Sequence, residues 1–164
     1  MIEAENIRLD KDDGESVLHW VEKLQESGEI IAFKSSTGAV PDGPALAKDA
    51  FILVIQTKYQ KEVYQKWGNE FIGVDATHNT THYDKMCSFT IMVRDQWGHG
   101  ESINFIPIYE AVVLITLFPN GCPAAWMLSS NATEATVDLF MGAVQTRSPK
   151  VNPKIIMSDT TGLK

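Results

Sequence analysis

Cysteine is scarce in this chain of 164 residues, and the two that occur, Cys87 and Cys122, are far apart in the sequence. Neither belongs to a C-x-x-C pair, so the sequence excludes a disulfide framework and a cysteine-based zinc finger. We therefore expect both side chains to be buried thiols.

Positive charge is also sparse, with 14 Lys and Arg against 21 Asp and Glu and a net charge of −7. Nine of the acids fall within residues 1–30, so the rest of the chain is close to neutral. No run of basic residues is present that would serve as a DNA footprint. We expect that any DNA contact inherited from an ancestor depended on residues elsewhere, and we keep open a protein partner.

An apolar leader is missing as well, because the N-terminal sequence MIEAENIRLDKDDGE is acidic and has no hydrophobic core of a signal peptide. The longest apolar stretch, residues 106–118, has Glu110 inside it and is too short to cross a bilayer. The sequence therefore predicts an intracellular protein, nuclear or cytoplasmic, with no membrane contact.

What the chain does contain is the pattern of an α/β domain behind a small α-rich segment. Residues 1–49 are expected to hold an acidic leader, a short amphipathic helix and a linker rich in Pro and Gly. Ser16 is the predicted cap of that helix and Gly28 its stop. The domain itself is assigned to residues 50–164. Its helices are predicted at 58–68 and 131–147, and its strands at 71–77, 86–95, 122–130 and 154–159.

The order strand–strand–strand–helix–strand predicts a mixed sheet. Three strands joined by tight turns run antiparallel, and the crossover helix lets the fourth strand lie parallel to an earlier one. If the fourth strand pairs with the first, Asp75 in FIGVDATHNTTHY (71–83) and Asp159 in KIIMSD (154–159) become neighbours at one edge of the sheet. Two adjacent carboxylates repel unless a divalent cation lies between them. The pair therefore predicts a Mg²⁺ or Mn²⁺ site of the kind used in two-metal phosphoryl transfer.

At these residues the chain resembles the transposase domain of Mutator-like elements (MULE), which has a ribonuclease H-like fold, and its host-domesticated relatives. The resemblance implies that Asp75 and Asp159 are the first and second acids of the D-D-E triad that holds Mg²⁺ for DNA cleavage and transfer. The matching pieces are FILVIQTKYQ (51–60), FIGVDATHNTTHY (71–83), FTIMVRDQWGHG (89–100), PAAWMLSSNATEATVDLFMGAV (123–144) and KIIMSD (154–159).

The chain departs from that family in three places. The third acid, a Glu, lies well beyond the second Asp in the family, and no residue among the five after Asp159 can be assigned to it. Family members often carry a WRKY- or FLYWCH-type finger before the domain or a SWIM finger after it, and two cysteines are too few for either. Residues 101–121 separate two strands that the family joins almost directly, and we interpret them as an insertion or a gene-model error. A transcript that joins GHG (98–100) directly to PAAW (123–126) would support the error.

Several other polar and aromatic residues near these motifs have plainer interpretations. His78 and His82 are four residues apart, but the residues between them favour a strand and a turn rather than the helix that brings such a pair to one zinc ion. Asp95 follows the second strand and is expected at the opposite edge from the candidate acids. Trp97 and Trp126 are expected to pack on the sheet, since no Lys or Arg is interleaved with them for base stacking.

These features predict a partial ribonuclease H-like α/β domain, a fragment or domesticated remnant of a DDE-type DNA transposase. We expect this chain to be inactive in strand transfer, because one of the three acids is missing. The alternative from another class is a non-catalytic adapter, in which exposed sheet edges pair with a protein partner. An in-frame continuation into a helix bearing Glu would favour the enzyme fragment, and a stop codon would favour the adapter.

Overall fold

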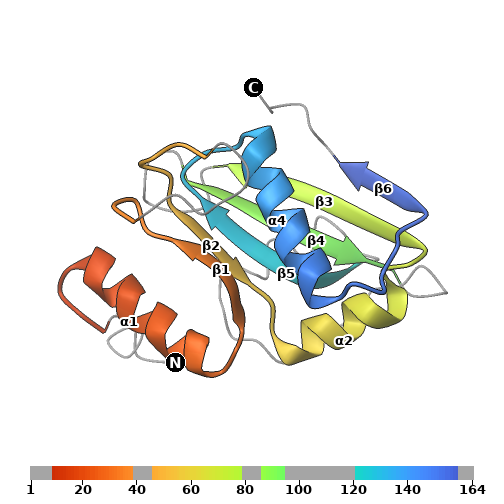
Figure 1. The fold of residues 1–164 in the computed structure, drawn as a ribbon, viewed down its shortest axis with the longest axis horizontal. Coiled ribbons are helices and arrows are strands. Elements are labelled where there is room, and N and C mark those ends of the chain that lie inside the picture. Colours follow the sequence, from red (N-terminus) through yellow and green to blue (C-terminus); the bar gives the residue numbers. More distant parts are fainter. Residues whose placement is uncertain (1–8, 39–45, 79–85, 95–120, 159–164) are drawn as a thin grey trace.

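The computed structural model describes residues 9–38, 46–78, 86–94 and 121–158. Its strands form one six-stranded sheet in the order β1-β2-β5-β4-β3-β6 (Figure 1). The elements follow the chain as α1 (Asp13–Glu26), β1 (Ile30–Lys34), β2 (Ile52–Ile55), α2 (Lys58–Trp67), β3 (Phe71–His78), β4 (Cys87–Val93), β5 (Cys122–Ser129), α4 (Glu134–Arg147) and β6 (Ile155–Ser158).

The predicted order strand–strand–strand–helix–strand is confirmed by β3, β4, β5, α4 and β6. Strands β3, β4 and β5 are antiparallel neighbours, and β6 pairs parallel to β3 after the crossover helix α4. The register places Gly73 beside Met157 and Val74 beside Ser158. The fold is therefore the expected α/β class with a mixed sheet, and its fourth predicted strand does pair with its first.

The N-terminal segment differs from the prediction at its helix cap and in a strand. Helix α1 is capped by Asp12, whose side chain accepts hydrogen bonds from two backbone N–H groups of the first turn, while the Ser16 hydroxyl accepts from Leu9 N. Aspartate caps a helix as well as serine does, so the helix gains a turn before Ser16. Gly28 ends the helix with a φ of 70°, as predicted. Strand β1 was not predicted, because its five residues gain their pairing only from β2.

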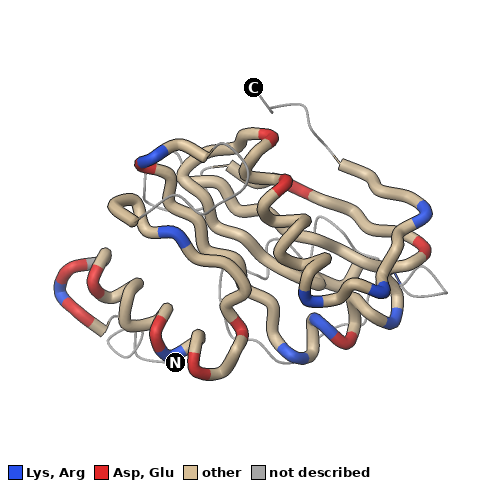
Figure 2. Tube along the Cα trace, in the orientation of Figure 1, with Lys and Arg blue, Asp and Glu red and all other residues tan. Residues whose placement is uncertain are grey.

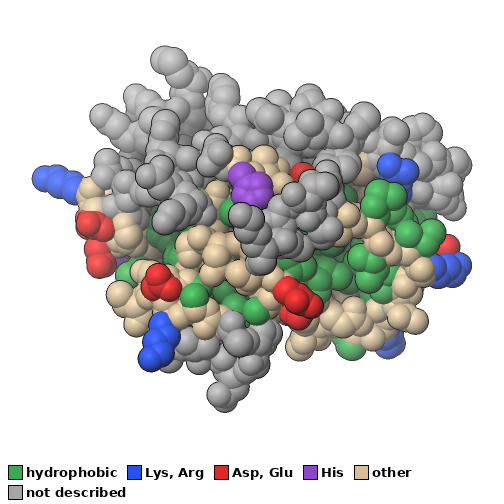
Figure 3. Space-filling view, turned by 90° about the horizontal axis from the view of Figure 1, so that it is seen from above, with side chains coloured by type: hydrophobic (Ala, Val, Ile, Leu, Met, Phe, Trp, Pro, Cys, Tyr) green, Lys and Arg blue, Asp and Glu red, His purple; other side chains and the backbone are tan. Residues whose placement is uncertain are grey.

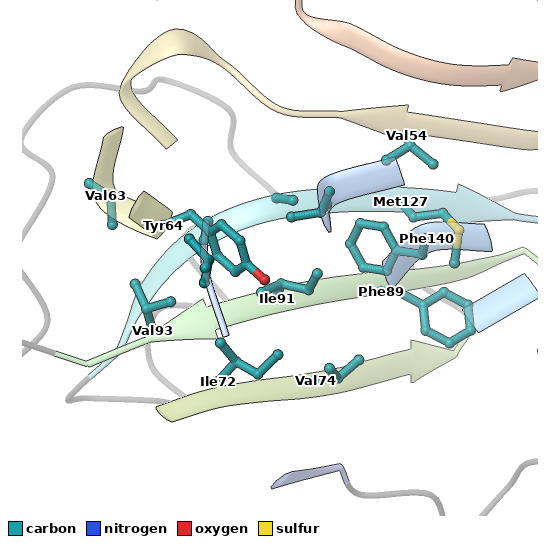
Figure 4. Packing of buried hydrophobic residues seen from close by; sticks show 14 of the residues in the cluster. Val54, Val63, Tyr64, Ile72, Val74, Phe89, Ile91, Val93, Met127 and Phe140 are labelled. Carbon is teal, nitrogen blue, oxygen red and sulfur yellow. The ribbon is translucent and has the colours of Figure 1, made fainter. Parts of the chain in front are cut away.

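A hydrophobic core fills the space between one face of the sheet and helices α2 and α4. Alternate residues of β2, β3 and β4 supply it together with residues of β5, and Tyr64 from α2 and Phe140 from α4 pack against them (Figure 4). Figure 1 shows α4 lying across this face of the sheet. None of the helices that the structure describes is long and apolar enough to cross a membrane. The sheet residues of the cluster include Ile52, Val54, Ile72, Val74, Phe89, Ile91, Val93 and Met127.

A buried lysine joins the first strand to the segment that follows it. The Lys34 ammonium donates to the carbonyl oxygens of Lys48 and Ala50 at 2.7 and 2.8 Å, and to that of Ser35 at 3.2 Å. Charge-assisted hydrogen bonds of this kind are about twice as strong as neutral ones. Lys34 therefore holds the chain from β1 to the start of β2 against the sheet.

Candidate functional site

Strand β3 places Asp75 on the face of the sheet that α4 does not cover. Successive side chains of a strand point to opposite faces, and Ile72 and Val74 point into the core beneath α4. Phe71, Gly73 and Asp75 therefore share the other face. The sequence carries an acid into a buried strand without burying the carboxylate, because alternation turns it away from the core.

Beside Asp75 the structure has an open pocket of about 340 Å³. Gly73 lies in its wall between Phe71 and Asp75, and its missing side chain leaves the space open. A Cβ built at Gly73 would lie 3.5 Å from the Phe71 ring and 3.9 Å from Met92 Cβ. The pocket is lined by Phe71, Gly73, Val74, Asp75, Met92, Arg94, Gly121, Met157 and Ser158.

Two threonines lie close to the Asp75 carboxylate. The Thr77 hydroxyl donates to Asp75 Oδ2 over 3.4 Å, a long hydrogen bond from the same face of the same strand. Thr90 is directly opposite Asp75 in the antiparallel β3–β4 pair, where facing Cβ atoms are about 4.5–5.5 Å apart. Thr90 is 1% exposed, and its hydroxyl has no hydrogen-bond partner among the residues that the structure describes. A buried hydroxyl without a partner next to a carboxylate is a donor available to that carboxylate or to its ligand.

Among the described residues that line the pocket, the one cation is Arg94, which directly follows β4. Its guanidinium lies 5.3 Å from the centre of the Phe71 ring, an arrangement that orients the charge through a cation–π contact. Arg94 forms no ion pair with a carboxylate in the part of the chain that the structure describes. The described lining of the pocket thus holds one carboxylate, Asp75, and one guanidinium, Arg94, which form no ion pair with each other.

The second predicted acid lies outside the described residues. Asp159 directly follows Ser158, whose register partner Val74 is the neighbour of Asp75. Four other features of the sequence also fall outside: His82, Asp95, Trp97 and residues 101–120 of the suspected insertion. Their predicted roles stay predictions, as does the domain boundary after residue 49.

The two cysteines and the first histidine do lie in described strands. Cys87 and Cys122 are both buried thiols, as expected. His78, the last residue of β3, faces Cys87 across the β3–β4 pair, with Nδ1 3.1 Å from Sγ. Burial raises the pKa of the Cys87 thiol above its ordinary value, which disfavours an activated thiolate at this position.

The donor atoms at Asp75 are oxygens, the ligand type that binds a hard cation. Carboxylate and hydroxyl oxygens, which Asp75 and Thr77 supply on one face of β3, are ligands of the type that Mg²⁺ prefers. Among the described residues no three His, Cys, Asp or Glu side chains are grouped closely enough to hold a metal ion. The chemistry of the donors therefore fits Mg²⁺, with a single acid present in the described part of the site.

Sequence reasoning missed Arg94, Thr90 and Gly73 as members of this site. Arg94 and Thr90 come to Asp75 only through the β3–β4 register, which a pattern of β-forming residues does not specify. A signal was available at Gly73, since a glycine inside a strand often marks a place where another group approaches closely.

Comparison with protein families matches residues 34–161, more than three quarters of the chain, to the family described as "Zinc finger SWIM domain-containing protein 1/3, RNaseH-like domain". The match includes Asp75, Arg94 and all the strands from β2 onward. Searches of curated proteins and of solved structures found no match. The expected ribonuclease H-like fold is thus confirmed.

Proposed function

The chain belongs to the family of ribonuclease H-like domains of zinc finger SWIM domain-containing proteins 1/3, and we propose that it is a remnant of a DDE-type DNA transposase of the Mutator-like kind. In this proposal Asp75 and Asp159 mark the ancestral Mg²⁺ site. The observation that carries it is the parallel pairing of β6 with β3, which brings the strand preceding Asp159 beside the strand that bears Asp75. In this arrangement two neighbouring acids would repel each other unless they share a cation, which is the reason for placing Mg²⁺ there.

The residues around Asp75 have separate tasks in such a site. The Asp75 carboxylate would hold the cation, and Thr77 orients one of its oxygens through the 3.4 Å hydrogen bond. Arg94 offers a guanidinium to the phosphate group of a bound strand, the ligand that its planar fork suits best. When bound, Mg²⁺ supplies charge stabilisation for the attacking and leaving oxygens of phosphoryl transfer.

We further propose that this chain binds the metal weakly and does not transfer DNA strands. In the described part of the pocket Asp75 is the one carboxylate. Mg²⁺ gives up its water ligands reluctantly. A site with so few acidic ligands is expected to bind it loosely and to keep most of its hydration shell.

Titration of the ¹⁵N-labelled chain with Mn²⁺ tests the metal site. We expect paramagnetic broadening centred on β3 near Asp75, and its loss in Asp75→Asn. Asp159→Asn tests the second acid in the same way. Broadening that is absent, or that is unchanged in Asp75→Asn, would remove the site from the proposal.

A plasmid-nicking assay with Mg²⁺ or Mn²⁺ tests the absence of strand transfer. We expect supercoiled DNA to stay intact with the wild-type chain. Cleavage by the wild type that Asp75→Ala abolishes would show an active nuclease and contradict the remnant interpretation.

The outer edge of β6 favours a second candidate function, a non-catalytic adapter. Strand β6 is at the end of the sheet order, and its Ile155, Ile156 and Met157 side chains are 57%, 58% and 61% exposed. In the space-filling view of the molecule from above, hydrophobic side chains gather mainly on the right-hand side (Figure 3). An exposed apolar edge strand is a template for pairing with another chain. If β6 pairs with a strand of another chain, the variant Ile156→Pro should abolish binding of that partner.

A further inference from the structure

Basic residues gather at one end of the molecule, where α2 meets the segment between α4 and β6. Residues 58–70 and 147–154 contain six basic residues against two acidic ones, a local net charge of +4 in a chain of net charge −7. Figure 2 shows these Lys and Arg positions along α2 and around the end of α4. We call this region the basic end; its basic residues are Lys58, Lys61, Lys66, Arg147, Lys150 and Lys154.

Hydrogen bonds hold the two segments of the basic end side by side. Asn69 Oδ1 accepts from Asn152 N at 2.8 Å, and the Asn69 carbonyl accepts from Lys154 N at 2.9 Å. The Val151 side chain packs against Gly68, where a Cβ would come within 2.8 Å of it. The charges of two segments that are far apart in the sequence therefore act as one surface.

Most of the basic end is available to a ligand. Lys58, Lys66 and Lys150 are exposed and Lys61 is half-buried. These four lysines form no ion pair with any other residue that the structure describes. Lys66 lies 4.6 Å from the centre of the Trp67 ring, which leaves its charge exposed while orienting it. Four cations without a carboxylate partner in the described part of the chain strongly attract an anion.

Helix stability does not explain the charge at the start of α2. Lys66 and Arg147 stand in the last turns of α2 and α4, where a cation is favoured by the helix dipole. Lys58, in contrast, is the first residue of α2, where the dipole disfavours a cation, and no acid balances it in that turn. A charge placed against the helix dipole points to a role in binding.

A hollow of about 400 Å³ lies within the basic end. Ser148 is 1% exposed, and its hydroxyl has no hydrogen-bond partner in the ranges that the structure describes. A hydroxyl and an ammonium group together suit a phosphate oxygen, which accepts from both. The hollow is lined by Gln65, Asn69, Ser148, Pro149, Lys150 and Val151.

We propose that the basic end binds the phosphate backbone of a nucleic acid, with one phosphate in the hollow beside Ser148 and Lys150. The charge complementarity between a +4 surface and a chain of regularly spaced phosphates supports this partner. The site needs neither Asp75 nor a metal, so it is independent of the proposed function.

Fluorescence anisotropy with labelled duplex and single-stranded oligonucleotides, in EDTA and over a range of salt, tests the proposal. We compare the wild-type chain with the double variant Lys58→Gln/Lys150→Gln. Each lost phosphate contact lowers the slope of log K against log salt by about 0.7 on single strands and 0.9 on duplex. We therefore expect a slope lower by about 1.4 or 1.8, and at least tenfold weaker binding at low salt. Comparing the affinities for duplex and single-stranded oligonucleotides shows which of the two the basic end prefers.

The matched control is Lys23→Gln/Lys48→Gln, which changes net charge equally at two exposed lysines outside the basic end. We expect the control to keep the wild-type slope. An equal loss in both double variants would show an effect of net charge alone and overturn the proposal. Removing Lys58 relieves an unfavourable helix charge, so an unchanged or raised melting temperature in the test variant excludes unfolding as the cause.

Two further outcomes would also overturn the proposal: no salt-dependent binding by the wild type, or competition by polyglutamate as effective as that by oligonucleotide. The metal titration separates this inference from the proposed function. A chain that binds Mn²⁺ at Asp75 but no nucleic acid contradicts only the inference about the basic end. A chain with the opposite behaviour contradicts only the metal site.

Discussion

Replacing Thr90 by valine should stabilise the protein and weaken its metal site at the same time. Thr90 is buried, and within the described part of the chain its hydroxyl has no hydrogen-bond partner. Burying a hydroxyl without a partner costs about 1–3 kcal/mol. Valine keeps the branched shape that suits a strand and replaces the hydroxyl by a methyl group. We expect Thr90→Val to raise the free energy of unfolding by about 1 kcal/mol. This is the lower end of that range, because the groups around the hydroxyl relax in the wild type and reduce its cost.

Urea denaturation followed by circular dichroism measures this change. With a slope of about 2 kcal/mol per molar urea, the midpoint should rise by about 0.5 M. Thr90→Ser is the matched control, because it keeps the hydroxyl and loses a buried methyl group, at a cost of about 1 kcal/mol. Equal or lower stability of Thr90→Val would refute the reasoning, because it would mean that the hydroxyl has a partner in the folded protein.

The metal titration supplies the second half of this test. Thr90 faces Asp75 across the β3–β4 pair, where its hydroxyl can donate to the carboxylate or to water on a bound ion. We expect Mn²⁺ to broaden the signals of β3 less in Thr90→Val than in the wild type, and Thr90→Ser to behave as the wild type. A valine variant that is more stable and binds Mn²⁺ equally well would leave Thr90 no part in the site.

Three other predictions concern the fold around the site. Lys34→Met should lower the free energy of unfolding by about 2–3 kcal/mol, because it removes buried charge-assisted hydrogen bonds of 2.7 and 2.8 Å. The control Lys154→Met breaks 2.8 Å contacts to a surface carboxylate and should cost less than about 1 kcal/mol. Equal losses of the two variants in urea denaturation would contradict this prediction. Gly68→Ala should cost about 2–3 kcal/mol, since its Cβ would lie 2.5 Å from a backbone oxygen of α2; Gly142→Ala, where nothing lies within 4 Å, is the control expected to keep or raise the melting temperature. Burial raises the pKa of Cys87 above its ordinary value of 9.0. The neutral thiol therefore stabilises the fold below pH 9, and this contribution is lost as the pH rises through the raised pKa. The difference in unfolding free energy between wild type and Cys87→Ala should shrink above pH 9, and a constant difference would contradict this prediction.

The strand order was predictable because each step depended on local pattern. Short apolar runs bounded by turn residues predicted β3, β5 and β6, and the capped amphipathic stretch at 131–147 predicted α4. Rules for tight turns and crossovers then allowed few arrangements. Strand β1 was missed because an edge strand of five residues has little pattern of its own, and the cap of α1 because Asp12 and Ser16 are equally good capping residues.

The site was predictable only in part, since among its described residues only Asp75 and Gly73 carry a signal in the sequence. Asp75 stands out as an acid at the end of an apolar run. Arg94 and Thr90 look like an ordinary arginine and threonine until the register of β3 with β4 places them around it. Only side-chain alternation in a known strand shows that Asp75 faces away from the core.

The sequence by itself determined the α/β class and the order of the central elements, because these follow from local periodicity and from general rules of chain connection. It allowed the pairing of β6 with β3 as one arrangement, and the structure decided it. The tertiary structure alone decided which groups share a surface. Six basic residues that are scattered through two segments form no stripe in the sequence, yet they lie together at one end of the folded chain. The physical reason is that charge acts through space, and the distance between two side chains is set by packing and register rather than by their separation along the chain.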